Sequence, residues 1–175
     1  MIDKKQIPYM ISLINDDSSS VRENVLKSFT DFGSDLYHLL EENPSGLNDN
    51  GMNYLFKQLT EYIMQNPAQN TLSQIKIGDK IKHKKYQYDG LIVDIDFYCF
   101  ANDDWYKKNN TQPDKLQPWY HVLVNGSSMV TYAAQSSVES TSNSQGMNHP
   151  YVTHFFDKNE NGDLVRNDKP WPREY

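Results

Sequence analysis

The spacing of apolar residues changes part-way along this 175-residue chain, and this change limits the possible folds more than any other feature. Up to about residue 65, apolar side chains recur every three or four positions, the period of one face of an α-helix. From about residue 75 they recur at every second position, the period of a β-strand. We therefore expect an α+β protein with helices first and strands second.

Four amphipathic segments predict helices in the first part. They lie at about residues 3–14, 20–33, 34–42 and 50–65. Ser20 and Glu23 have the spacing of a capping box, in which each side chain satisfies the other residue's backbone amide. The apolar stripes predict a small helical bundle over residues 1–65. Residues 66–74 are polar and aperiodic, which is typical of a linker.

Several short apolar runs predict strands in the second part. They lie at about residues 75–85, 91–97, 119–124, 130–134 and 152–156. Asn125 and Gly126 separate two of them and match a type I′ hairpin turn, whose central residues both need positive φ. We expect residues 75–175 to form a small antiparallel barrel or a strongly bent sheet. Residues 98–117 form a long polar connection that carries Trp105.

Composition and charge exclude several classes of protein. The net charge is −6, and the first 75 residues hold 10 acidic and 5 basic side chains, which opposes general DNA binding. No apolar run is long enough to span a membrane, and residues 1–6 do not resemble a secretory signal. Cys99 is the single cysteine, so an internal disulfide framework is excluded and a reducing compartment is favoured. We expect a cytoplasmic protein with no membrane partner.

One local run has the charge that nucleic acids require. Lys80, Lys82, Lys84 and Lys85 surround His83. In a strand, alternate lysines repeat about every 6.6–6.8 Å on one face, close to the phosphate spacing along one DNA strand. The run is therefore a candidate DNA-binding or partner-binding surface. It is equally typical of an edge strand that lysines protect from aggregation.

Aromatic and histidine side chains supply further candidates for binding. Tyr88, Trp105, Trp119 and Tyr120 are suited to a platform on which bases stack or a peptide docks. Aromatic residues of small barrels more often lie in the core, which we expect for Tyr120. Trp105, in its polar loop, is the better surface candidate. His121 is a further candidate, and we expect it to be partly buried and hydrogen-bonded within the barrel.

The carboxylates and histidines of the chain do not have the spacing typical of a catalytic or metal-binding site. Asp94 and Asp96 share one strand face and suit an acid–base pair, but a solvated or salt-bridged face is the commoner role of such a pair. The histidines are scattered, without the close spacing of zinc ligands. We expect no catalytic residues, no metal, no cofactor and no small-molecule substrate. The chain is therefore interpreted as non-enzymatic.

The second part resembles the HspQ/YccV-like family, also called the hemimethylated-DNA-binding domain. The resemblance runs in order over about residues 75–175. It is carried by residues 78–83 (Gly-Asp-Lys-Ile-Lys-His), 86–90 (Tyr-Gln-Tyr-Asp-Gly), 92–96 (Ile-Val-Asp-Ile-Asp), 117–124 (Gln-Pro-Trp-Tyr-His-Val-Leu-Val), 131–135 (Thr-Tyr-Ala-Ala-Gln), 149–150 (His-Pro), 155–156 (Phe-Phe) and 171–175 (Trp-Pro-Arg-Glu-Tyr). Gln87 departs from the family pattern because it stands where the Tyr-Gly-Tyr turn has glycine. Residues 3–33 more weakly resemble a HEAT-like helical hairpin.

The family resemblance implies a small, SH3-like, partly open antiparallel β-barrel. It also implies two activities, which are binding of hemimethylated DNA and action in the heat-shock response as an adaptor that delivers proteins to an ATP-dependent protease. The partner is accordingly DNA, or a protein such as the protease or its substrate. The family name favours DNA, whereas the acidic helices and the lack of a large basic patch favour a protein partner.

Overall fold

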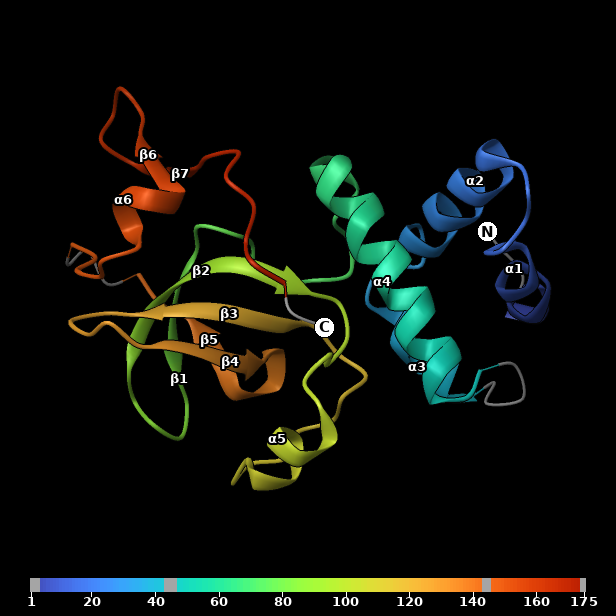
Figure 1. Cartoon of the computed structure of the whole chain (residues 1–175), viewed down its shortest axis with the longest axis horizontal. Coiled ribbons are helices and arrows are strands. Elements are labelled where there is room, and N and C mark those ends of the chain that lie inside the picture. The colour runs from blue at the N-terminus through green and yellow to red at the C-terminus, as the bar shows by residue number, and fades with distance from the viewer. Residues whose placement is uncertain (1–3, 43–46, 143–145, 174–175) are drawn as a thin grey trace. The chain divides into compact units, whose positions relative to one another are not determined.

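The computed structural model of the chain describes residues 4–42, 47–142 and 146–173. Expectations for residue 3 and for the last two residues of the resemblance, Glu174 and Tyr175, lie outside these ranges. The chain divides into two compact units, Met1–Gln74 and Ile75–Tyr175 (Figure 1). Within the described residues, no helix has both the length and the apolar character needed to cross a bilayer.

The first unit is helical. Its elements are η1 (Lys4–Gln6), α1 (Ile7–Leu13), α2 (Ser19–Thr30), α3 (Asp35–Glu42), α4 (Asp49–Gln65) and η3 (Pro67–Gln69). Each of the four α-helices buries apolar residues along one side, as the spacing predicted. Helix α2 packs against α1 and α4, and Phe29 and Phe56 are fully buried. The likeness of this unit to a HEAT hairpin stays a prediction.

The capping box predicted at Ser20 is wrong. Helix α2 begins one residue earlier and its N-cap is Ser18, so Ser20 lies inside the first turn. The Asp16 side chain accepts a hydrogen bond from the Ser18 amide at 2.9 Å, which closes the preceding turn and moves the helix start. Arg22 reinforces this turn by donating to the carbonyl of Asp16 at 2.5 Å.

The segment expected to be a linker, residues 66–74, packs on the helices. It contains η3 and the fully buried Leu72. The Thr71 hydroxyl donates a short hydrogen bond to the carbonyl of Thr30 at the end of α2. These residues are therefore part of the helical unit.

The second unit is built on a five-stranded antiparallel sheet (Figure 1). Its strands are β1 (Lys80–His83), β2 (Asp89–Asp96), β3 (Trp119–Val124), β4 (Val130–Ala134) and β5 (Val138–Ser140), in the order β4-β3-β2-β1-β5. The other elements are α5 (Asp103–Lys108), η4 (Gln135–Ser137), α6 (Val152–Phe155), β6 (Phe156–Lys158) and β7 (Leu164–Arg166). Strands β6 and β7 form a separate two-stranded sheet.

The helices and the antiparallel sheet confirm the α+β class. In the described part of the chain, β4 and β5 are the two edges of the large sheet and do not pair with each other. No closed barrel is present among the described strands, and the expected SH3-like barrel stays a prediction.

A bulge in β2 controls which face its side chains occupy. Ile92 pairs with Val122 and Asp94 pairs with His121, so Val93 is an extra residue in β2. One extra residue reverses the alternation of side chains beyond it. Asp94 and Asp96 therefore lie on the face that carries Leu91 and His121, and all of β2 after Asp89 is buried.

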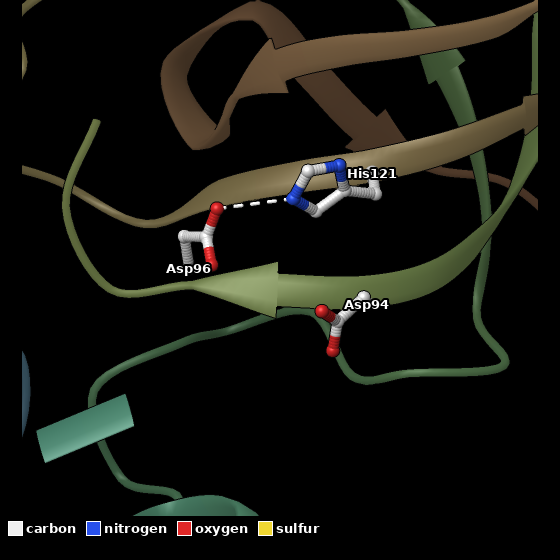
Figure 2. A group of neighbouring side chains, drawn as sticks. All are labelled: Asp94, Asp96 and His121. Carbon is white, nitrogen blue, oxygen red and sulfur yellow. Dashed lines mark hydrogen bonds and ion pairs between the residues drawn. The ribbon is translucent and has the colours of Figure 1, made fainter. Parts of the chain in front are cut away.

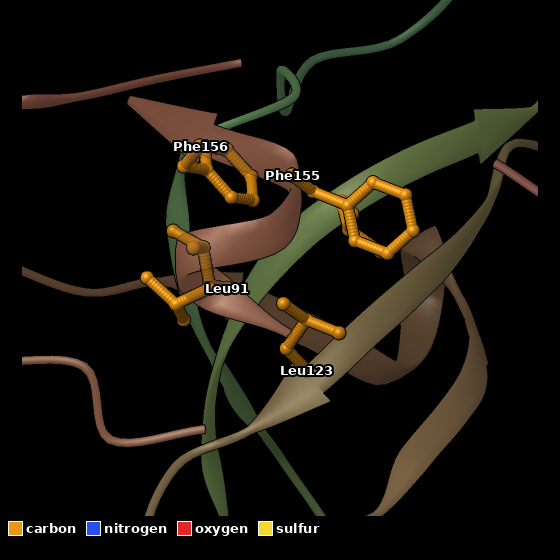
Figure 3. Packing of buried hydrophobic residues seen from close by; sticks show 6 residues of the cluster. Leu91, Leu123, Phe155 and Phe156 are labelled. Carbon is orange, nitrogen blue, oxygen red and sulfur yellow. The ribbon is translucent and has the colours of Figure 1, made fainter. Parts of the chain in front are cut away.

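An apolar cluster covers one end of this face (Figure 3). Its buried members are Leu91, Val93, Leu123, Val152, Phe155 and Phe156. A strand was expected from Val152, but residues 152–155 form a helical turn before β6 begins. The turn places Val152 and Phe155, three positions apart, on one side of the helix, where both are buried.

The hairpin between β3 and β4 forms where Asn125-Gly126 predicted it, but the turn is longer. Val124 donates its amide to the Met129 carbonyl at 3.0 Å, so four residues form the loop. Gly126 has a φ of 71°, whereas Asn125 is not among the non-glycine residues with positive φ. A type I′ turn would need positive φ at both. The Asn125 amide instead donates to the Asp89 carbonyl, which fixes the loop against β2.

Cys99 lies just beyond β2 in a second buried cluster with Trp119 and Ala134. Burial raises the pKa of its thiol to about 11. The thiol is therefore protonated at neutral pH.

Gln87 occupies the left-handed backbone region in the turn between β1 and β2, with a φ of 57°. Glycine adopts this region without steric cost, while other residues pay roughly 1–2 kcal/mol. Gln87, which stands where the Tyr-Gly-Tyr turn of the resembled family has glycine, is therefore in a strained backbone conformation. Gln87 offsets part of the strain because its side-chain amide donates to the Lys84 carbonyl at 2.5 Å.

Replacing Gln87 by glycine is expected to stabilise the second unit by about 0.5–1 kcal/mol, because relief of strain exceeds the added entropy of the unfolded chain. Gln87→Ala is the matched control, since it removes the side-chain hydrogen bond and keeps the strain. Urea unfolding measures both. A Gln87→Gly protein no more stable than Gln87→Ala would contradict the assigned strain.

Candidate functional site

A groove of about 470 Å³ runs along the edge strand β4 of the second unit. Five residues predicted for the binding site line it together: His83, Tyr88, Trp105, Trp119 and His121. Their proximity could not be predicted from the sequence, because these residues come from β1, the β1–β2 turn, α5 and β3. The groove therefore gathers the aromatic part of the predicted site.

Strand β4 is the common element of the groove. All five of its residues, Val130–Ala134, contribute to the lining. Tyr132 pairs with His121 and shares its face, whereas the Thr131 hydroxyl lies on the other side and hydrogen-bonds the Tyr88 hydroxyl at 2.8 Å. The groove thus includes side chains from both faces of the sheet and passes around its edge.

The backbone of β4 presents hydrogen-bonding groups to this groove. Val124 donates to Met129, and Gln135 donates to the Pro118 carbonyl at 2.8 Å, so the odd-numbered residues of this strand bond to β3. The amides and carbonyls of Val130 and Tyr132 point the opposite way. Across the ranges that the structure describes, no residue hydrogen-bonds these outer groups.

Trp105 and Tyr86 are exposed aromatic residues of the groove, with 39% and 48% of their surfaces accessible. Trp105 is the one that the sequence predicted at the surface. It lies on α5, whose N-cap Asn102 accepts a hydrogen bond from the Trp105 amide. The indole packs edge-on against Trp119 at 6.3 Å and is tilted against Tyr132 at 5.9 Å. Contacts from β3 and β4 therefore hold the ring that α5 carries. The prediction of Trp105 at the surface is confirmed, as is the burial of Tyr120.

His83 is almost fully buried, whereas the sequence analysis placed it on a basic surface together with the lysines. Its Nδ1 accepts hydrogen bonds from the amides of Lys85 and Tyr86, both at 3.2 Å. The ring also packs on Tyr86 at 4.7 Å and Tyr88 at 5.0 Å. Burial, with a smaller contribution from the Lys85 charge, lowers the pKa of His83. The neutral imidazole thus shapes the turn.

The four predicted lysines do not line the groove. Strand β1 pairs with β2 on one side and β5 on the other, so the interpretation of the lysine run as an edge strand is wrong. Lys82 lies directly between two carboxylates, because Asp89 of β2 and Glu139 of β5 are its partners in register. Residues opposite one another share a face, so these acids oppose the positive potential of Lys82.

The other lysines are dispersed. Lys84 lies beyond the end of β1, and its ammonium group donates to the Ser136 carbonyl at 2.8 Å. The Lys85 ammonium group lies over the Tyr86 ring at 5.6 Å. The lysine that does line the groove is Lys108, from the end of α5, which sequence analysis missed.

A second feature is a cluster of Asp94 and Asp96 from β2 with His121 from β3, which lie on one face of the sheet (Figure 2). Their nearest nitrogen and oxygen atoms lie within 4.8 Å of one another, a spacing compatible with a metal ion. The guanidinium of Arg173 already contacts both carboxylates, at 2.6 Å from Asp94 and 3.1 Å from Asp96. The salt-bridged alternative for this pair is therefore confirmed and the solvated one is wrong.

Hydrogen bonds fix the imidazole and the second carboxylate. His121 Nε2 lies 3.0 Å from Asp96, which confirms that this histidine is partly buried and hydrogen-bonded. The Tyr132 hydroxyl donates to the same Asp96 oxygen at 2.9 Å. Burial raises the pKa of Asp94, although the neighbouring Arg173 acts in the opposite direction. Burial and the Asp96 charge raise the pKa of Tyr132 well above its usual value.

Comparison with known proteins identifies the family of the second unit. A family model described as hemimethylated DNA-binding protein YccV like matches residues 73–163. The chain belongs to this YccV-like family. The description names DNA binding rather than a reaction. That the chain itself is not an enzyme stays a prediction.

Curated relatives share part of the chain. F-box only protein 21 of Mus musculus, of Pongo abelii and of Homo sapiens are each 35% identical to it over 83 residues, or 46% of this chain. The match covers 13% of the length of each relative. The YccV-like chain therefore spans a small part of these proteins.

The neutral state of His83 predicts a pH dependence of stability. A folded-state pKa below 6.5 means that the contribution of His83 is complete above pH 6.5 and is lost as the pH falls through the folded-state value. His83→Asn keeps an acceptor in place of Nδ1 and removes the titration. The free energy of unfolding of the wild-type protein should fall more steeply below pH 6.5 than that of His83→Asn. Equal slopes in urea titrations would contradict the assignment.

Proposed function

We propose that the YccV-like unit binds an extended segment of a partner protein along β4, within the aromatic groove. The single observation that carries this proposal is the outward-facing backbone of Val130 and Tyr132 at an open sheet edge. An extended peptide that adds as a strand gains main-chain hydrogen bonds there. The proposed function is therefore binding of a polypeptide, with no chemical step.

The groove also supplies contacts for side chains of such a segment. Successive residues of a strand point to opposite sides, and the lining includes Trp105 and Tyr132 on one face of the sheet and Tyr88 on the other. Asn109, Asn110 and Lys108 add polar groups at the α5 side. Aromatic surfaces with a few polar groups favour affinity for a polypeptide together with selectivity for its side chains.

Charge supports a protein partner over nucleic acid. Lys82 has a carboxylate opposite it on each neighbouring strand, and the chain as a whole carries a net charge of −6. Non-specific DNA affinity depends on unopposed basic side chains that neutralise phosphates. The family resemblance suggests the kind of partner, an ATP-dependent protease or a protein delivered to it, in the cytoplasm.

Substitution of Val130 tests the docked strand. Val130→Pro removes the outward amide and leaves the β3–β4 ladder intact, because Val130 does not bond to β3. Val130→Ala is the matched control, which keeps the amide. Dodecapeptides selected by phage display on the full wild-type chain should bind Val130→Pro at least tenfold more weakly and Val130→Ala almost unchanged, as measured by fluorescence anisotropy.

The same peptides test the aromatic contacts. Trp105→Ala should weaken them about tenfold, and Trp105→Phe by less, since the ring is retained. If library selection yields no peptide, or if Val130→Pro and Val130→Ala bind the selected peptides equally, the proposed docking along β4 is wrong. Circular dichroism on each variant shows whether the sheet is retained.

A second function, binding of hemimethylated DNA, is favoured by the description of the matched family. Its candidate surface is the turn that exposes Lys84 and Lys85, next to β1. DNA bound through lysines should dissociate steeply as salt rises from 50 to 200 mM, whereas peptide binding along β4 should change little.

A labelled hemimethylated duplex, with unmethylated and fully methylated duplexes of the same sequence, provides the measurement. If DNA binding is the function, Lys84→Glu with Lys85→Glu should abolish binding, while Val130→Pro should not. If the wild-type protein binds all three duplexes equally and the double lysine variant loses binding to all of them, the lysines contact phosphates and methylation is not read. No binding to any duplex at 50 mM salt would exclude this second function.

A further inference from the structure

Two carboxylates of β2 are buried almost completely beside the groove. Asp94 and Asp96 expose 0% and 1% of their surfaces, and the bulge at Val93 places both on the face that carries His121. Figure 2 shows the Asp96 carboxylate pointing toward the His121 ring. We call the site formed by Asp94, Asp96, His121 and the Tyr132 hydroxyl the acidic recess. Buried carboxylates are tolerated only when cations or hydrogen-bond donors compensate them.

Arg173 supplies that compensation from the far end of the chain. Its two terminal nitrogens contact different carboxylates, Nη2 at 2.6 Å from Asp94 and Nη1 at 3.1 Å from Asp96. Nη2 also donates to the Ile95 carbonyl at 3.2 Å. A planar guanidinium with several fixed donors matches this set of acceptors, whereas a lysine ammonium would not reach them all at once.

The segment that carries Arg173 is held mainly by side chains. Trp171 packs against His121 at 5.3 Å and Phe155 at 5.1 Å between ring centres. Residues 167–173 form no helix or strand. In the part of the chain that the structure describes, Trp171 and Pro172 make no backbone hydrogen bond. The segment can therefore leave without disrupting a ladder.

The recess can also be approached from solvent on another side. A hollow of about 330 Å³ is lined by Asp96, His121, Tyr132 and Trp105, with Phe100, Ala101 and Asn102. Asp96 thus borders a hollow next to the groove while Arg173 contacts its other oxygen. Asp94 Oδ1 has no hydrogen-bond partner among the described residues, so the recess retains an unused acceptor.

We propose that the acidic recess is an arginine-binding site, which the chain fills with its own Arg173 and which accepts an arginine side chain of a second polypeptide when residues 171–173 leave. Trp171–Arg173 is then an intramolecular occupant that competes with that ligand. The recess shares His121 and Tyr132 with the groove, but the inference rests on the carboxylates and Arg173 and not on the proposed docking along β4.

The test uses the full chain and the peptide acetyl-Trp-Pro-Arg-amide. Arg173→Ala should bind this peptide, measured by calorimetry, at least tenfold more tightly than the wild-type protein, whose recess is occupied. A peptide with glutamine in place of arginine should bind Arg173→Ala at least tenfold more weakly. Arg173→Ala combined with Asp96→Asn should also bind the arginine peptide at least tenfold more weakly.

Two measurements keep the test decisive if Arg173→Ala is unstable. Methylguanidinium should raise the melting temperature of Arg173→Ala more than tetramethylammonium does at the same concentration. Only methylguanidinium carries N–H donors that replace those of the lost Arg173 side chain. In the wild-type protein, excess arginine peptide should shift the NMR signals of the Trp171 indole toward those of a solvent-exposed tryptophan.

Each alternative outcome overturns the proposal. A folded Arg173→Ala that does not distinguish the arginine and glutamine peptides would show a purely structural ion pair. An unfolded Arg173→Ala that methylguanidinium does not restore, with no change in the wild-type spectra, would show the same. Binding of Mn²⁺ or Zn²⁺ by Arg173→Ala without peptide binding would make the recess a metal site. Val130→Pro should leave all these results unchanged, which separates this site from the docking edge.

Discussion

The extra residue in β2 determines how the second unit is organised. By inserting Val93 between Ile92 and Asp94, the bulge places Leu91 and the two aspartates on the same face of the sheet. The apolar part of this face packs on α6 and β6, and the acidic part lies beside His121. Without the bulge, Asp94 and Asp96 would face the opposite side. The C-terminal segment would then have no carboxylates for Arg173 to contact.

The open edge of the sheet is the second constraint. Because β3 is the one described strand that pairs with β4, the outer backbone groups of β4 lie in the aromatic groove. An edge strand of this kind invites pairing with another chain, and proteins usually protect such edges. Here Trp105 lies beside the edge and Tyr132 projects from it, and both restrict which segments can approach. The groove and the acidic recess share Tyr132 and His121, so both candidate sites depend on the same two strands.

The spacing of apolar residues predicted the helices and most of the strands, and Asn125-Gly126 predicted the hairpin, because all of these depend on local sequence. The resemblance at residues 117–124 correctly predicted the YccV-like family. Strand order was beyond such reasoning, so an edge strand stayed one of two interpretations of the lysine run although β1 is interior. Periodicity also treated Asp94 as part of a regular strand, since a bulge leaves no clear mark in one sequence. Arg173 and Tyr132 were missed because their partners lie 77 and 36 positions away.

The buried thiol of Cys99 has a practical consequence for studies of this protein. A protonated sulfur that solvent hardly reaches reacts slowly with maleimides and other alkylating reagents. The native chain is therefore close to a cysteine-free background without any substitution. A single cysteine introduced on an exposed part of α5 would accept a fluorophore or spin label selectively, and its signal would report the arrival of a ligand at the neighbouring groove.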